Sequence, residues 1–185
     1  RTMDGVVIGL HVNPNGGVPK HPVESIVVHS EGCVGDKQND RKHHGGPLRA
    51  VCLLERRVME LLQSAGHPIH PGSTGENILF DGLREGSMTI GSTLAVGGVV
   101  LLITGDAPPC KTIQASFTDG SFKQLSHKQT LGQTRWYASV IQQGTVHLGD
   151  KVRLLSEDEA VDNLRIIDST AQFHGNTNVV QVHIL

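Results

Sequence analysis

Two segments of the chain share an alternating pattern that strongly limits the folds open to it. Residues 86–96 and 144–154 each place apolar side chains at every second position on both sides of a short turn, which is Gly91-Ser92 in the first segment and Gly149-Asp150 in the second. A period of two means that one face of a strand is buried and the other contacts solvent. We therefore predict two hairpins, which favour a small β-barrel over a sheet covered by helices on both faces.

The rest of the chain contains further short apolar runs separated by turn residues. The predicted strands cover residues 5–12, 24–29, 50–54, 78–80, 87–90, 93–96 and 99–104. The predicted helices cover residues 55–65, 134–143 and 157–167, and the last of these follows a capping box made by Ser156 and Glu159. We expect a mainly β protein with a closed barrel over residues 1–155 and a few short helices.

The segment 156–185 is predicted to be an appendage to the barrel. It combines the capped helix with a weakly alternating stretch at 179–185 that could add a strand. The sequence leaves open whether this appendage packs on its own barrel or on a second copy of the chain, so a homodimer is one expectation.

The composition is typical of one compact domain. The chain has 185 residues, 37% of them hydrophobic but only 3% aromatic, so we expect an aliphatic core. Its 16 basic residues are balanced by 18 acidic ones and form no long run, which argues against nucleic acid or a membrane surface as a partner. With no signal peptide pattern or apolar run of membrane-spanning length in this sequence, we expect a soluble cytoplasmic protein.

The three cysteines differ in their surroundings. Their wide spacing predicts neither a disulfide framework nor a thiolate-rich zinc site, and agrees with a reducing compartment. Cys52 lies inside an apolar run and is predicted to be an inert core residue, whereas Cys33, between glycines, is interpreted as an incidental surface thiol. Cys110 follows an apolar strand and two prolines and precedes Lys111, a cation that favours the reactive thiolate.

Two polar loops precede the Cys110 segment. Residues 35–47 are rich in cations and histidines, and Gly45-Gly46 lets backbone amides approach a ligand closely, which suits an oxyanion. A solvated surface loop explains the same composition equally well. Adjacent His43 and His44 point opposite ways in an extended chain, so zinc is disfavoured. Residues 71–77 form a second, turn-rich loop in which Glu76 and Asn77 could make specific contacts.

These three segments, in this order and spacing, resemble the signatures of the MOSC domain family, named after the C-terminus of molybdenum cofactor sulfurases, and especially its small stand-alone bacterial members. Gly35-Asp36 with His43-His44-Gly45-Gly46 resembles the first signature, Gly75-Glu76-Asn77 the second and Pro109-Cys110 the third. The resemblance extends over about residues 5–155 and implies a closed, pyruvate-kinase-barrel-like fold.

The resemblance also implies binding of the molybdenum cofactor, molybdopterin carrying a molybdenum ion. Cys110 would be the catalytic residue and the metal or sulfur ligand. Arg41, His43, His44 and Arg49 are assigned to the cofactor's terminal phosphate, and Glu76 with Asn77 to the pterin. The full set of expected cofactor-binding residues is Asp36, Arg41, His43, His44, Gly45, Gly46, Arg49, Gly75, Glu76, Asn77 and Lys111.

One position departs from the family. Many relatives have an arginine where this chain has Ala107, so a cation near the thiol is missing, and Lys111 is the residue expected to replace it.

Two functions follow from the resemblance. The first is an oxidoreductase that reduces N-hydroxylated compounds, and the alternative is a carrier of sulfur or cofactor for other molybdoenzymes. The chain shows no pyridoxal phosphate or iron–sulfur domain, so its expected partners are a small-molecule substrate and an external electron donor or sulfurase. A barrel-shaped interaction module without redox chemistry is the third and least favoured hypothesis.

Overall fold

A closed β-barrel forms the centre of the computed structural model, which describes residues 4–38 and 45–174. The strand order is β11-β7-β8-β9-β5-β6-β1-β2, and β1 also pairs with β11, so the seven strands from β11 to β1 close into a ring. The seven strands are β1 (Gly5–Val12), β5 (Val51–Glu55), β6 (Ile78–Asp81), β7 (Thr93–Val96), β8 (Val99–Ala107), β9 (Arg135–Gln142) and β11 (Lys151–Leu154). The predicted mainly β, closed-barrel fold is therefore confirmed.

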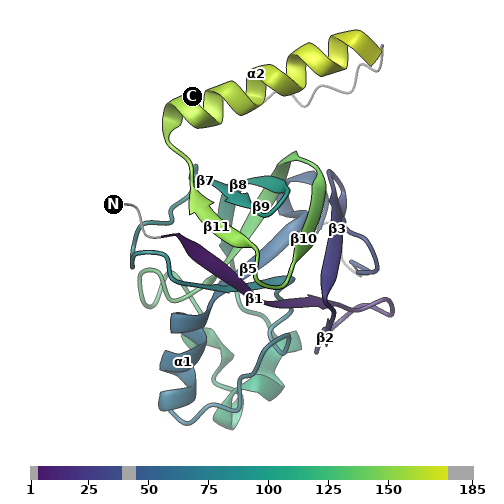
Figure 1. Ribbon diagram of the computed structural model, residues 1–185. Coiled ribbons are helices and arrows are strands. Elements are labelled where there is room, and N and C mark those ends of the chain that lie inside the picture. The colour runs from purple at the N-terminus through teal and green to yellow at the C-terminus, as the bar shows by residue number, and fades with distance from the viewer. Residues whose placement is uncertain (1–3, 39–44, 175–185) are drawn as a thin grey trace.

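Smaller elements surround the barrel. The short strand β2 (His21–Pro22) pairs with the end of β1, and β10 (Gly144–His147), β3 (Ser25–His29) and β4 (Gly32–Cys33) form a separate sheet. Helix α1 (Arg56–Ser64) and helix α2 (Glu157–His174) lie at opposite ends of the molecule (Figure 1). The short 3-10 helices are η1 (Pro47–Arg49), η2 (Lys111–Ser116), η3 (Thr118–Gly120) and η4 (Phe122–Gln124).

The core is aliphatic, as the composition predicts. Side chains from every strand of the ring are buried inside the barrel, among them Val7, Leu53, Ile78, Phe80, Leu94, Leu101, Ala138 and Val152. A second apolar cluster joins the barrel to α1 and to the η2–η4 segment, and includes Leu54, Leu62, Ile69, Ile113 and Leu125. The fold thus gives the loops at one end of the barrel a rigid support.

The predicted helix at 134–143 is wrong, because this segment is strand β9. It lies between β5 and β8, and all side chains from Arg135 to Ala138 are buried. A strand covered on both faces loses the alternation that identifies a half-exposed strand. The apolar spacing of Tyr137, Val140 and Ile141 therefore imitated one face of a helix.

Both predicted hairpins are also wrong in their pairing. No strand covers residues 87–90, and β7 instead pairs with β8 across Gly97-Gly98. Strands β10 and β11 flank the Gly149-Asp150 turn as predicted, yet β10 pairs with β3, while β11 pairs with β1 and β7. Alternation reports which face of a strand is buried, and it carries no information on the neighbouring strand.

The predicted capping box is confirmed at the start of α2. The Glu159 amide donates to Ser156 Oγ at 3.3 Å, and the Ser156 amide donates to Glu159 Oε2 at 2.9 Å. The helix continues to His174, beyond the predicted end at 167, and the expected strand at 179–185 lies outside the described residues. In the described part of the chain, no helix has the length and apolar character needed to cross a membrane.

Candidate functional site

A cavity of about 470 Å³ opens where β1 and β8 end and where β5, β6 and β9 begin. All three polar segments singled out in the sequence reach it, although they are far apart along the chain. Six of the expected cofactor-binding or metal-binding residues are among those that line it, namely Asp36, Arg49, Gly75, Asn77, Cys110 and Lys111.

The other expected site residues either do not line this cavity or lie outside the residues that the structure describes. Gly45, Gly46 and Glu76 are not among the described lining residues. Arg41, His43 and His44 lie outside the described residues. The amide of Gly46 donates to Gln38 Oε1 at 3.1 Å, so this glycine pair supports Gln38, which does line the cavity.

Asp36 connects the first loop to the second. Its carboxylate accepts hydrogen bonds from the Asn13 amide at 2.8 Å, from Asn77 Nδ2 at 2.9 Å and from Lys20 Nζ at 2.5 Å. Asn77 also accepts the Cys52 amide at 3.1 Å, which ties the loop to β5. These side chains are therefore held in place before any ligand binds, and the Asp36 charge is neutralised by Lys20.

Glu76 is completely buried behind the cavity. Its carboxylate accepts the Gly72 amide at 2.5 Å and the Thr74 hydroxyl at 2.7 Å, both within its own loop. Burial lowers the pKa of the neighbouring His11 while Glu76 acts in the opposite direction. The two hydrogen bonds of Glu76 hold the second loop in its conformation, so Glu76 has a structural role here.

Cys110 is the exposed member of the three cysteines. It is partly exposed at the cavity, and its Sγ donates to Thr112 Oγ1 at 3.2 Å. Cys52 is buried, as predicted, and burial raises the pKa of its thiol even though the charge of Arg135 opposes the shift. The interpretation of Cys33 as a surface thiol is wrong, because β4 buries it and burial raises the pKa of Cys33 to about 12.

These differences predict selective alkylation. Iodoacetamide at mildly alkaline pH is expected to modify the native protein once, at Cys110, because the thiolate is the reactive form and the other two thiols are buried and stay protonated. Peptide mass spectrometry before and after unfolding checks this, with Cys33 and Cys52 reacting only after unfolding. Rapid native labelling of Cys33 would contradict the description of its environment.

Arg135 lines the cavity and was missed by the sequence analysis. It is only 6% exposed and links two loops: Nη1 donates to the Thr74 carbonyl, and Nη2 donates to the carbonyls of Ala107 and Pro108 at 3.3 and 3.2 Å. Many relatives have an arginine at the position of Ala107. In this chain, Arg135 on β9 brings a positive charge to the same place, in addition to Lys111. In the sequence analysis, 134–143 was treated as a helix and Arg135 was assigned no role.

The cavity is strongly basic. Its described lining includes five basic side chains (Lys20, Lys37, Arg49, Lys111 and Arg135) and a single carboxylate, Asp36. The chain as a whole has a net charge of -2, so positive charge is concentrated here. The Arg49 guanidinium carbon also lies 5.6 Å from the centre of the Tyr137 ring. Such a cavity favours an anionic ligand.

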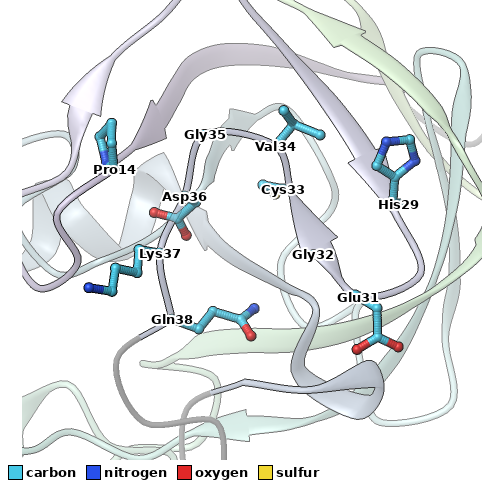
Figure 2. Close-up of a pocket in the computed structure, with 10 residues that line it drawn as sticks. All are labelled: Pro14, His29, Glu31, Gly32, Cys33, Val34, Gly35, Asp36, Lys37 and Gln38. Carbon is cyan, nitrogen blue, oxygen red and sulfur yellow. The ribbon is translucent and has the colours of Figure 1, made fainter.

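A second, more open hollow of about 550 Å³ shares Asp36, Lys37 and Gln38 with the cavity (Figure 2). Its other lining residues include His29, Glu31 and Cys33, whose pKa is raised to about 12 by burial. It therefore has fewer cations and no reactive thiol, and the cavity at Cys110 is the better candidate for chemistry.

No cluster of three or more His, Cys, Asp or Glu side chains within residues 4–38 and 45–174 could hold a metal ion. A metal at Cys110 would therefore have one sulfur ligand from this part of the chain.

Comparisons with known proteins agree on one family. The model of the MOSC domain matches residues 40–153. The chain is 29% identical to the uncharacterized protein YflK of Bacillus subtilis over 145 residues, which are 77% of this chain and 65% of YflK. It is 30% identical to protein YiiM of Escherichia coli over 146 residues, which are 76% of this chain and 60% of YiiM.

The comparison with solved structures shows a shared fold. The crystal structure of E. coli YiiM matches with a TM-score of 0.58 at 22% identity, over 85% of this chain and 71% of that one. The chain spans less than two thirds of the length of the two relatives YflK and YiiM.

Proposed function

The chain belongs to the MOSC domain family, and we propose that it binds the molybdenum cofactor with Cys110 as a ligand and uses it to reduce N-hydroxylated compounds. One observation carries the proposal: Cys110 lines a basic cavity at which three separate loops of the barrel meet. The family is associated with this cofactor, while the reaction and the substrate are our proposal.

The residues of the cavity suit this group. A soft thiolate such as that of Cys110 can complete a molybdenum site whose other sulfur ligands belong to the pterin. The basic side chains Lys37, Arg49 and Lys111 suit its terminal phosphate, because charge-assisted hydrogen bonds to phosphate are strong. Asn77 and Gly75 line the same cavity, and we assign the pterin to them.

When bound, the cofactor supplies two-electron redox chemistry. The substrate R–NHOH takes up two electrons and two protons, its N–O bond breaks, and the products are R–NH2 and water. The chain would bind and orient the reactants, with Thr112 Oγ1 orienting the Cys110 sulfur at 3.2 Å. Its cysteines are too far apart in sequence for an iron–sulfur motif, so the electrons would come from an external donor.

The test is the metal content of the purified protein. Produced in a host that makes the cofactor, the protein should contain near-stoichiometric molybdenum and pterin, and produced in a host that cannot make it, neither. Metal-free protein from the competent host that stays inactive after reconstitution would count against the proposal. A persulfide trapped on Cys110 without turnover of any hydroxylamine would instead favour the sulfur carrier.

A further inference from the structure

Arg135 is a buried cation for which no carboxylate forms an ion pair anywhere in the described part of the chain. Its hydrogen-bond acceptors are the three carbonyl oxygens of Thr74, Ala107 and Pro108. Neutral carbonyls satisfy N–H donors but do not neutralise the charge, and a buried charge without a counter-charge is costly. An anion would remove this cost.

The hydrogen-bonding capacity of Arg135 is also incomplete. A guanidinium has five N–H donors, and three of them are accounted for by the three carbonyls. Nε is buried and has no partner, and Nη1 has a second hydrogen available. The Nη2 hydrogens are taken by carbonyls, so the free donors do not form a parallel pair. An oxyanion in the cavity would complement Arg135 through its negative charge and through the second hydrogen of Nη1.

The position of Arg135 places such an anion near Cys110. Arg135 is the first residue of β9, it contacts the carbonyl of Pro108 two residues before Cys110, and both residues line the same cavity. Lys111 adds a second cation on that side. Because the guanidinium is fixed by three carbonyls from two loops, its ordering cost is met during folding and does not reduce the affinity for a ligand.

We propose that Arg135 is the fixed cation that binds a tetrahedral oxyanion, a phosphate-type group, at the Cys110 cavity. The group is either a free inorganic oxyanion or the phosphate of a monoester. The identity of the natural ligand rests on the proposed function, whereas the binding of the oxyanion can be measured without the cofactor.

The test uses the full chain from a host that cannot make the cofactor, with Cys110 as the reporter. Inorganic phosphate and phenyl phosphate are titrated against the rate at which iodoacetamide, a neutral reagent, modifies Cys110, with chloride at equal ionic strength as the reference. Both probes should slow the reaction of the wild type. Tighter binding of phenyl phosphate identifies a monoester as the ligand class, and equal or tighter binding of phosphate identifies a free oxyanion.

Arg135→Met should weaken phosphate binding by about 10- to 100-fold, since hydrogen bonds to charged groups contribute about 1.5–3 kcal/mol. Arg135→Lys keeps the charge but loses the Nη1 donor that the carbonyls hold in place, and should bind with intermediate affinity. Arg84→Met removes an exposed arginine that does not line the cavity and should leave the affinity unchanged. A folded Arg135→Met variant with wild-type phosphate affinity would overturn the inference and leave Arg135 as a link between loops.

A second measurement does not depend on the folding of the methionine variant. In the wild type, phosphate should shift the NMR resonance of the Arg135 Nε–H group, which is assigned by its absence in Arg135→Lys. A resonance that does not move overturns the inference. Phosphate binding that depends on Arg135 in a protein that never acquires molybdenum would support this inference and refute the proposed function. Protein that contains molybdenum but shows no Arg135-dependent phosphate binding would support the proposed function and refute this inference.

Discussion

Replacing Cys110 by alanine is expected to lower the reduction of N-hydroxylated compounds by about 100-fold or more, because even the outer partners of metal ligands contribute about 10- to 100-fold. Cys110 is partly exposed, and the structure gives its sulfur one hydrogen bond, to Thr112. The variant should therefore unfold at the same temperature as the wild type. Turnover with a chemically reduced viologen as donor, together with thermal unfolding, measures both quantities.

Two matched variants make this result specific. Thr112→Val keeps the sulfur but removes its hydrogen bond, and should lower turnover less than Cys110→Ala does, by about 10-fold. Cys33→Ala removes a buried thiol that does not line the cavity, and should affect stability more than turnover. A Cys110→Ala variant that is as active as the wild type would refute the role assigned to this sulfur.

Replacing Gly72 by alanine is expected to give the largest loss of stability, about 4 kcal/mol, because two separate costs combine at this position. Gly72 has φ +82°, in the left-handed region that disfavours residues with a Cβ atom, and its new methyl group would clash with the Lys20 carbonyl oxygen. The Gly72 amide also donates to Glu76 Oε1, so the second loop would shift as a whole.

Gly86 offers a control that separates the two costs. It has φ +71°, but a Cβ atom there would meet no other atom within 4 Å. Gly86→Ala should therefore lose only the conformational part, about 1–2 kcal/mol. Chemical denaturation of both variants measures the difference, and equal losses would show that the clash at Gly72 is relieved by movement of the backbone.

The sequence was sufficient to predict the type of fold, but only part of the strand arrangement and of the site. Length, alternation and turn residues were sufficient for the closed barrel, because they determine which side chains are buried. Strand partners were not predictable in this way, so β10 and β11 were joined in one hairpin, although β10 pairs with β3. Strand β9 was mistaken for a helix because it is buried on both faces, with Trp136 on one face and Tyr137 on the other.

For the site, the sequence identified the three loops but not every role within them. Cys110, Lys111 and Asn77 line the cavity as expected, because polar residues at strand ends meet at one end of a barrel. Glu76 is fully buried instead of lining the cavity, since the loop closes around its carboxylate. Arg135 is close to Cys110 only in three dimensions, through the pairing of β8 with β9.

The coordination of molybdenum tests the central claim most directly. X-ray absorption at the molybdenum edge counts the sulfur ligands of the metal in the loaded protein. We expect one more sulfur ligand in the wild type than in Cys110→Ala, at a distance typical of a metal–thiolate bond. The same number of sulfur ligands in both proteins would contradict the assignment of Cys110 as the ligand.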